Sequence, residues 1–462
     1  VLLFYTTQEV YTKLGIVSFR LVVRLSLPSM WAQVSSVVMQ YIDAAMLGHL
    51  NADAAAAAGV VASVTWLFGG LCAALTTGFT VQAAQASGGG EQARTRGIMR
   101  HGLWVAFCVG MCMALLGLWL SIRLPVWLGA EASIHGSAAR YFQIYAISMP
   151  FVQLNGYAAG MLQSSGNMRV PGMLTAGMYG MDVLFNFLLI FPTRRLELFH
   201  LPLTVPGAGL GVEGAALGTA LSEILTGLLM LYMLLAREPG MKLRRGEPFF
   251  APGFREVLGR AFRLGSPIAL EQVVMRFAQT TVVGMIAPLG NVAMAAHSLA
   301  ITAESFCYMP AYGIGLAQVA ITGREIGAGD KKRARQMGWA GIGFAAMVTI
   351  ALSVVLFLFA PQLMRTLTPD SELILLGTKI LRIEAFAELM YGTQLVCAGI
   401  LQGRGDTLVS STLMLGSLWL VRVPLSMLLI RPLGLVGAWL AMSIELNVRG
   451  ILFLLRFQFS KR

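Results

Sequence analysis

Three carboxylic acids stand inside otherwise apolar stretches in the first half of the chain. Asp43 is the one acid between Arg24 and Leu50, and Asp182 and Glu223 lie in two later apolar runs. A carboxylate at the centre of a bilayer costs about 2.5–3.5 kcal/mol, so it normally faces a polar cavity and marks the path of an ion or a substrate. These acids are therefore the first candidates for chemistry.

Two amides, Asn155 and Asn186, accompany these acids. Asp182 and Asn186 are four residues apart, which places them on one face of a helix. A carboxylic acid keeps its proton more readily in surroundings of low dielectric constant than in water. Paired acids near amides can therefore bind a proton near neutral pH, or hold Na⁺ with oxygen ligands at Asp43 and Asp182. The competing interpretation is that each acid simply hydrogen-bonds a neighbouring helix.

The second half carries both acids and bases in its apolar stretches. Because the two signs nearly balance, structural ion pairs between helices compete with a functional interpretation. Glu445 and Arg449 have the i,i+4 spacing that favours such a pair. The second-half candidates for a functional role are Glu271, Glu384 and Glu388. The other charged residues in these stretches are Arg276, Glu304 and Arg422.

The sequence lacks the motifs of several enzyme classes. It contains no GxxxxGK[ST], HExxH or GxSxG. The five cysteines lie in apolar stretches and the five histidines are scattered. Two glycine-rich loops, GGGEQARTR (88–96) and GAGDKKRAR (327–335), are better explained as helix ends than as phosphate cradles. We expect no catalytic residues, no metal site and no cofactor beyond a coupling ion.

Composition defines the elements that must position these residues. Only 12% of the 462 residues are charged, against about 25% in soluble domains, and the mean hydropathy is +0.71. The apolar runs exceed the roughly 20 residues that span a bilayer as a helix, and they lack the alternation of a β-barrel. We therefore predict an all-α integral membrane protein with twelve transmembrane helices. The predicted segments are 24–49, 53–86, 97–122, 137–163, 171–191, 210–236, 264–288, 292–324, 337–360, 373–402, 409–430 and 433–457.

An internal repeat divides these helices into six and six. RLSLPSMWAQ (24–33) matches RLGSPIALEQ (263–272), and AGMLQSSGN (159–167) matches AGILQGRGD (398–406) at the same shift of 239 residues. We predict two pseudo-symmetric lobes with the substrate path between them. The predicted boundaries are a cytoplasmic lead-in over 1–23, an N-lobe over 24–236, a linker over 237–263, a C-lobe over 264–457 and a cytoplasmic tail over 458–462.

Lys and Arg are distributed unevenly between the two sets of loops. Loops on one side hold 17 of them and loops on the other side hold 8. Because positive residues accumulate on the cytoplasmic side, both termini should be cytoplasmic. This distribution accounts for the net charge of +12 without nucleic acid. We expect a multi-pass protein of the inner membrane that contacts lipid and a small-molecule substrate, and that is a monomer.

The chain resembles the multidrug and toxic compound extrusion (MATE) transporters from about Arg24 to Arg456. The resemblance is carried by YIDAAMLGHL (41–50), MPFVQLNGYAAGMLQSSGN (149–167), LGVEGAALGTAL (210–221), APLGNVAMAAHSLA (287–300) and PAYGIGLAQVAITGREIGAGDKKRAR (310–335). It implies two six-helix bundles around a V-shaped cavity. It also implies alternating-access export of amphipathic or cationic drugs or metabolites in exchange for H⁺ or Na⁺.

The resemblance also suggests roles for individual residues. Asp43 matches the family's first-helix acid, Asn155 its fourth-helix amide and Thr219 its sixth-helix hydroxyl. DinF-like members have Asn followed four residues later by Asp, whereas here Asp182 precedes Asn186, which moves the carboxylate by one helical turn.

The second half departs from one branch of the family. The acids that NorM-like members use on the seventh and tenth helices fall at Met275 and Tyr391. The sequence is therefore closer to the DinF-like pattern, and we expect H⁺ coupling at the first lobe, with Na⁺ as the alternative ion.

A related function remains open at this stage. A lipid-linked oligosaccharide flippase of the same superfamily would need a cationic cavity for pyrophosphate, and Arg276 and Arg422 are the available residues. Whether these arginines line the cavity or pair with Glu271 and Glu445 separates the two functions. A lipid-modifying enzyme would need clustered His or acids at one interface, and a channel would need a ring of charges or a filter repeat. The sequence shows none of these.

Overall fold

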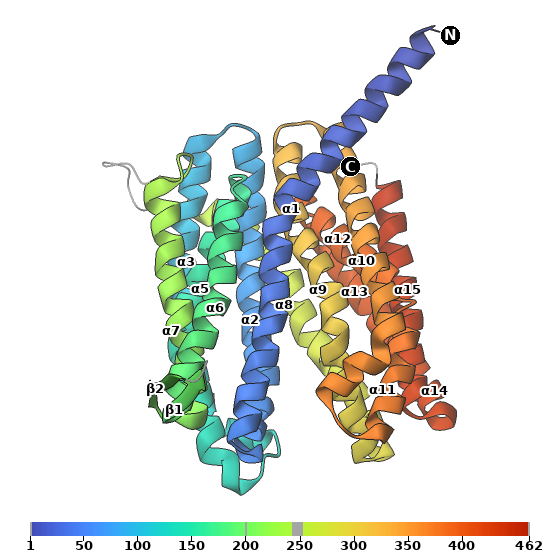
Figure 1. Ribbon diagram of the computed structural model, residues 1–462. Helices are drawn as coiled ribbons and strands as arrows, with labels where there is room; N and C mark the ends of the chain where they lie inside the picture. The colour runs from blue at the N-terminus through green and yellow to red at the C-terminus, as the bar shows by residue number, and fades with distance from the viewer. Residues whose placement is uncertain (1, 199–200, 243–252, 461–462) are drawn as a thin grey trace. The chain divides into compact units, whose positions relative to one another are not determined.

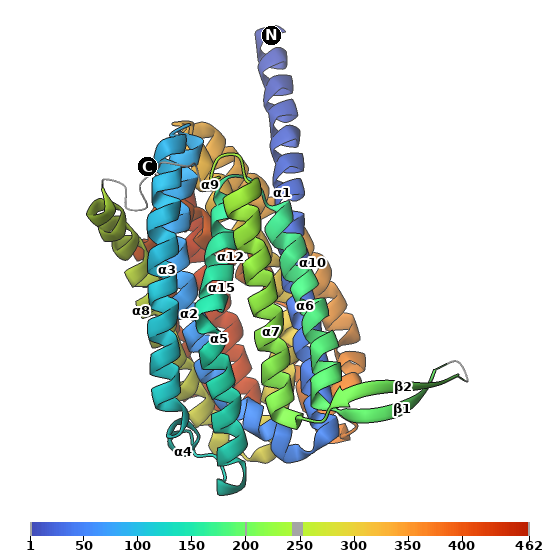
Figure 2. The same ribbon diagram turned by 90° about the vertical axis from the view of Figure 1, so that its left-hand side faces the viewer.

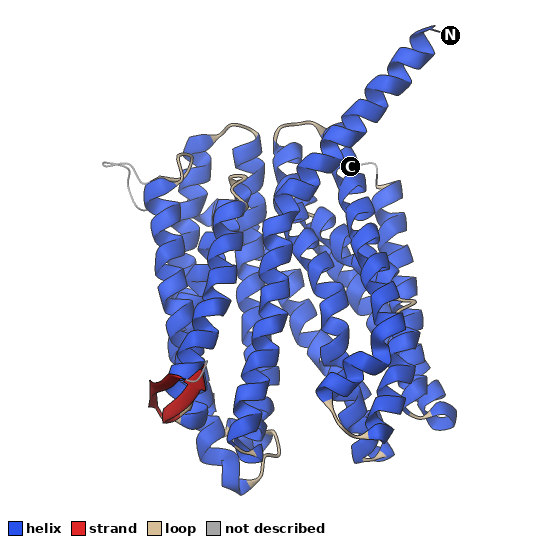
Figure 3. Ribbon diagram, in the orientation of Figure 1, coloured by secondary structure: helices blue, strands red, loops and turns tan. Residues whose placement is uncertain are grey.

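A computed structural model describes residues 2–198, 201–242 and 253–460, and the described chain is almost entirely helical (Figure 3). The centre of the predicted linker, 243–252, lies outside the described residues. Contacts between residues divide the chain into two units. Unit 1 contains the chain up to Val34, the short stretch Ala84–Gly90 and everything from Ser266 onward, and unit 2 contains Ser35–Ala83 and Glu91–Gly265. The residue boundaries predicted for the lobes remain predictions.

Three of the described helices, each labelled in Figure 1, contribute residues to both units. These are α1 (Leu2–Leu50), α2 (Ala52–Gly88) and α8 (Phe254–Ile286). Helix α1 changes unit between Val34 and Ser35, so its last sixteen residues, with Asp43 among them, pack in unit 2. A candidate membrane span over Gly15–Leu50 of α1 contains the first predicted segment, 24–49.

Unit 2 is built on four long helices that run side by side (Figure 2). Helix α3 packs on α5, and α7 packs on both α5 and α6. The helical elements that lie wholly in this unit are α3 (Gln92–Ser121), α4 (Leu124–Trp127), a 3₁₀ turn (Ala132–Ile134), α5 (His135–Ser164), α6 (Arg169–Ile190), α7 (Gly211–Tyr232) and a π turn (Met233–Arg237).

Unit 1 is organised around α9, which packs on α10 and α12. A Cβ atom added to Gly399 of α12 would lie 2.1 Å from the carbonyl oxygen of Gly315 in α9, so glycine permits this close crossing. Its elements are α9 (Asn291–Gly327), α10 (Lys331–Leu367), α11 (Ser371–Glu384), α12 (Glu388–Arg404), α13 (Thr407–Ser417), a π turn (Leu418–Arg422), α14 (Val423–Leu433), α15 (Leu435–Phe459) and a 3₁₀ turn (Ala287–Leu289).

The repeat predicted from the sequence recurs in the helix boundaries. Adding 239 to the bounds of α2 gives those of α9, and the same shift carries the first residue of α3 onto the first residue of α10. The two intervening loops turn at matching glycines with positive φ, Gly90 at 76° and Gly329 at 79°. The interpretation of these glycine-rich loops as helix ends is confirmed.

Eight described helices are long and apolar enough to cross a membrane. They correspond to the first, second, third, fifth, sixth, ninth, eleventh and twelfth predicted segments. Three others, α5, α8 and α9, contain buried polar side chains such as Gln153, Glu271 and Glu304 that lower their hydropathy. The tenth predicted segment, 373–402, is divided between α11 and α12, each shorter than a full span.

The interruption between α11 and α12 falls between two buried acids, Glu384 and Glu388. A broken helix leaves carbonyl groups that need other donors, since the bilayer interior offers no water. Here the hydroxyl of Ser353 in α10 donates a hydrogen bond to the carbonyl oxygen of Ala385. Hydropathy did not predict the break because apolar residues continue through it.

A β-hairpin occupies the predicted loop 192–209. Strand β1 (Pro192–Leu198) pairs antiparallel with β2 (Leu201–Ala208). The hairpin connects α6 to α7 and projects sideways from their ends (Figure 2). It adds a small sheet to an otherwise helical fold.

Candidate ion-coupling site

Local packing places Asp43 against helix α6. Leu47 lies one turn after Asp43 and belongs to a buried cluster with Ile190 of α6 and Ala215 of α7. This apolar contact fixes the C-terminal part of α1 beside both helices. As a result the partly buried Asp43 side chain faces Asn186, one turn before Ile190.

The amide of Asn186 joins two carboxyl groups. Its Nδ2 donates to Asp43 Oδ1 at 2.8 Å and to Asp182 Oδ2 at 3.2 Å. Asp182 and Asn186 are fully buried, at 1% and 0% exposure. The shared helix face predicted for these two residues is confirmed, and the order Asp182 then Asn186 still brings a carboxyl group of α6 to Asp43.

Helix α7 supplies the hydroxyl groups of the site. The Oγ atom of Ser222 lies 3.3 Å from Asp182 Oδ1 and 2.9 Å from the carbonyl oxygen of Thr219, and the Thr219 side chain also interacts with Asp182. The family resemblance predicted Thr219 as a site residue but did not indicate Ser222. Its position three residues after Thr219, on the same helix face, was the signal that could have found it.

A glycine lets α7 approach Asn186 closely. A Cβ atom at Gly218 would lie 2.0 Å from Asn186 Oδ1 and 3.0 Å from the Asn186 backbone nitrogen. Any side chain at this position would displace the amide that joins the two acids. Among the described residues, Asn186 Oδ1 accepts no hydrogen bond, so it remains available as an oxygen ligand.

The fourth-helix amide pairs with a different acid. Asn155 Nδ2 donates to Glu223 Oε2 at 2.8 Å and lies 3.6 Å from Met178 Sδ. The structure thus brings Asp43, Asp182, Asn186 and Thr219 together and places Asn155 beside Glu223. Glu223 was predicted as an intramembrane acid, but the residues predicted for the coupling site did not include it.

The Asp43–Asp182–Asn186 cluster can hold one positive charge. Two ionised carboxylates so close in a low-dielectric interior repel each other strongly, and one proton or one monovalent cation relieves the repulsion. In the part of the chain that the structure describes, neither acid forms an ion pair with Lys or Arg. Within that same part, no three His, Cys, Asp or Glu side chains are arranged to hold a metal ion. Sodium would therefore depend on amide and hydroxyl oxygens as well.

The second-half candidates Glu384 and Glu388 lie in unit 1. Both are fully buried, and their four carboxyl oxygens accept no hydrogen bond from the described residues. Glu304 of α9 is buried beside them, and Arg422 is close enough to act on Glu304 and Glu384 electrostatically. The structure thus groups Glu304 with two of the three second-half candidates.

Other charged side chains of unit 1 have local partners. Arg449 Nε lies 3.2 Å from Glu445 Oε1, which confirms the predicted i,i+4 pair. Arg276 Nη1 donates to Gln279 Oε1 at 2.9 Å. Glu271, which is 7% exposed, lies near Ser411 and Arg449. Glu271 therefore interacts with different helices from Glu384 and Glu388.

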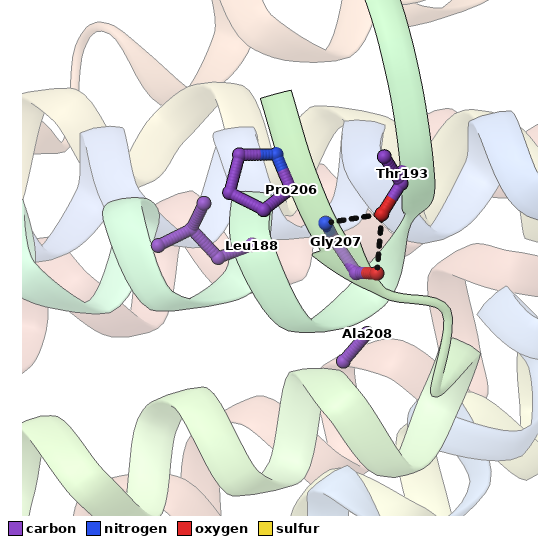
Figure 4. Close-up of a pocket in the computed structure, with 5 residues that line it drawn as sticks. All are labelled: Leu188, Thr193, Pro206, Gly207 and Ala208. Carbon is purple, nitrogen blue, oxygen red and sulfur yellow. Dashed lines mark hydrogen bonds between the residues drawn. The ribbon is translucent and has the colours of Figure 1, made fainter. Parts of the chain in front are cut away.

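A pocket of about 300 Å³ lies where α6 meets the hairpin (Figure 4). Thr193 Oγ1 and Gly207 face each other there: the hydroxyl accepts from the Gly207 amide at 3.1 Å and donates to its carbonyl at 3.2 Å. The other lining residues are Leu188, Pro206 and Ala208. A lining without charged groups gives this pocket no role in ion coupling.

Known proteins resemble the chain over almost its whole length. A probable multidrug resistance protein NorM from Thermotoga maritima is 26% identical over 438 residues, covering 94% of this chain and 91% of the relative. A probable multidrug resistance protein NorM from Bradyrhizobium diazoefficiens is 28% identical over 453 residues, covering 95% and 93%. A crystal structure of MATE in complex with MaD3S superposes with a TM-score of 0.87 at 21% identity, covering 96% of this chain and 95% of that chain.

The structural match supports the predicted fold, an all-α membrane transporter with two lobes. The model of the MatE family matches residues 28–188 and 267–428, which are more than two thirds of the chain and correspond to the two halves of the repeat. The chain is a multi-pass membrane protein that belongs to the MatE family of multidrug efflux transporters.

Proposed function

We propose that this transporter is an antiporter that exports amphipathic, cationic drugs or metabolites in exchange for inward H⁺. The observation that carries the proposal is the Asn186 amide shared by two carboxyl groups, Asp43 and Asp182, with no ion pair to a basic side chain among the described residues. Such a site is most stable when it holds one positive charge. A proton supplies this charge when it binds from one side of the membrane, and the site loses the charge when the proton leaves to the other side.

The coupling would act through helix packing. With one proton shared, α1 and α6 stay joined at Asn186, and Thr219 and Ser222 hold Asp182 against α7. Loss of the proton leaves two like charges at the joint, which favours a different packing of α1. The proton would then bind to one packing arrangement of α1, and the cationic substrate would bind to the other. Na⁺ is the alternative ion.

The site residues favour the DinF-like pattern over the NorM-like one. The acids and amides of the first half gather in unit 2, whereas Met275 and Tyr391 stand where NorM-like members place their second-half acids. Glu271, Glu384 and Glu388 remain candidates for a secondary role. The flippase alternative is weaker because Arg276 bonds Gln279, and Arg422 lies among acids that offset its charge.

The location follows from the family and the loop charges. We propose a monomer in the inner membrane with both termini in the cytoplasm, where the loops richer in Lys and Arg would lie. Its partners would be lipid and the small-molecule substrate, with no nucleic acid.

Replacing Asp43 tests the proposal directly. We expect Asp43→Asn to reduce export of a fluorescent organic cation from proteoliposomes to background, because an amide cannot exchange a proton. Its melting temperature in detergent should stay near that of the wild type. Asp53→Asn is the control, since Asp53 is exposed at the start of α2 and should leave export unchanged. Normal export by Asp43→Asn would remove this residue from the mechanism.

Separate gradients identify the coupling ion. Proteoliposomes given only a pH gradient should export the cation, and those given only a Na⁺ gradient should not. The opposite result would assign the site to Na⁺, for which the two carboxylates and Asn186 Oδ1 would be the ligands.

A further inference from the structure

We propose that Glu223 and Asn155 form a second proton-binding site in unit 2, separate from the Asp43–Asp182 pair, so that each cycle moves two protons. This inference deepens the proposed function and depends on it for the transport step. It begins with the position of Glu223 at the thirteenth residue of the 27-residue span Gly211–Arg237. An acid at this depth needs a neutralising partner.

No basic side chain provides that partner. In the described part of the chain, Glu223 forms no ion pair with Lys or Arg. Helices α5 and α6 pack on α7, and they present Tyr145 and Asp182 as the titratable groups that act on Glu223. Asp182 is another acid, and a tyrosine cannot neutralise a carboxylate, so the surroundings favour uncharged Glu223.

The polar contact of Glu223 suits both of its protonation states. Asn155 is only 8% exposed, and its Nδ2 donates to Glu223 Oε2 at 2.8 Å. Its other amide atom, Oδ1, is buried and accepts no hydrogen bond within the described residues. A turn of the amide about its terminal bond would point Oδ1 at Glu223, where it can accept a bond from the protonated acid. The side chain can therefore follow the loss and gain of a proton without a change of backbone.

Separate amides keep the two sites distinct. Asn186 joins Asp43 and Asp182, whereas Asn155 contacts Glu223 and Met178 and, among the described residues, forms no hydrogen bond to either aspartate. One proton can satisfy the aspartate pair because an amide holds both carboxyl groups together. Glu223 has no such partner acid on Asn155, so its neutralisation takes a proton of its own.

Charge balance gives this inference a measurable consequence. Two protons entering and one monovalent cation leaving move one net positive charge inward per cycle. Export would then respond to membrane potential as well as to the pH gradient. With Glu223 unable to titrate, one proton would exchange for one cation and transport would become electroneutral.

Infrared difference spectroscopy of the purified full-length protein tests the site without any substrate. Titration from alkaline to acidic pH should produce carboxylic-acid C=O bands in the wild-type protein. Glu223→Gln should remove one of these bands, and Asp43→Asn should leave that band in place. Glu213→Gln is the matched control: this acid also lies in α7 but pairs at the surface with Arg140 at 2.7 Å, so the buried bands should be unchanged. A Glu223→Gln spectrum identical to the wild type, or loss of the same band in Asp43→Asn, would overturn the separate site.

Proteoliposomes test the stoichiometry with ethidium as the transported cation. An inside-negative or inside-positive potential should change the wild-type export rate and leave the rate of Glu223→Gln unchanged. Equal dependence on potential in the two proteins would contradict the second proton. A weaker ethidium affinity in Glu223→Gln with an unchanged infrared spectrum would also contradict it, and would assign Glu223 to substrate binding. Should Glu223→Gln fail to fold, Glu223→Asp should shift the same infrared band. Failure of the proposed function is distinguishable, because Asp43→Asn would then export normally.

Discussion

At the scale of single residues, the proposed ion site depends on one position that carries no functional group. Gly218 leaves room for Asn186, whose amide is the only described group bonded to both Asp43 and Asp182. Sequence reasoning could identify the acids, because an acid in an apolar run is conspicuous. It could not identify Gly218, because glycine is common throughout this chain and its role depends on the helix that faces it.

Gly218→Ala should therefore impair coupling more than folding. The added methyl group would push Asn186 away from the two acids, and misplaced supporting groups typically cost about tenfold or more in activity. Export from proteoliposomes should fall by roughly that factor, with an altered pH dependence. Gly180→Ala in α6 is the control, since a Cβ atom there meets nothing within 4 Å. Full export by Gly218→Ala would show that Asn186 tolerates displacement.

At the scale of elements, the chain interrupts a helix where hydropathy predicts a continuous span. The break between Glu384 and Glu388 leaves the carbonyl of Ala385 without a helical partner, and Ser353 of α10 supplies the donor. Thirty-two residues separate donor and acceptor. A pattern read along one segment therefore cannot reveal that its break is satisfied by another helix.

Removing that donor should destabilise unit 1. Ser353→Ala leaves a carbonyl oxygen unsatisfied in the protein interior, which costs about 1–3 kcal/mol. Chemical unfolding in mixed micelles should show this loss of free energy. Thr366→Ala, in the same helix but exposed and bonded only to the Leu363 carbonyl, should change the free energy of unfolding little. Equal effects of the two substitutions would argue that the Ser353 bond adds nothing specific.

At the scale of the whole molecule, the repeat and the loop charges predict the topology. The bounds of α2 and α9 differ by the same 239 residues that relate the sequence motifs. Loops at corresponding places carry Lys and Arg in both halves, GGGEQARTR after α2 and GAGDKKRAR after α9. Both loops should face the cytoplasm.

Cysteine labelling in intact cells tests this orientation. In a variant whose five native cysteines are replaced, Glu372→Cys should react with a membrane-impermeant maleimide and Lys331→Cys should not. Both side chains are exposed, at the starts of α11 and α10, so accessibility depends on the side of the membrane. Permeabilised cells provide the control, because both positions should then react. The reverse pattern in intact cells would invert the proposed topology.

The sequence by itself determined the helical membrane fold, the repeat and the intramembrane acids. Hydropathy, spacing and net charge are properties of contiguous residues, and the cost of burying a charge is evident wherever an acid interrupts an apolar run. Sequence patterns did not predict the hairpin over 192–208, because this segment lacks a long apolar run and was predicted to be a loop.

Only the tertiary structure decided which acids work together. Asp43 and Asn186 are 143 residues apart, Asn155 and Glu223 are 68 apart, and each bond depends on how two helices face each other. Helical periodicity places a side chain on a face, but the neighbour of that face is chosen by packing across the bundle. That packing brings Asn155 into hydrogen-bonding distance of Glu223 and Asn186 into hydrogen-bonding distance of the two aspartates, since a hydrogen bond needs its two atoms within about 3 Å.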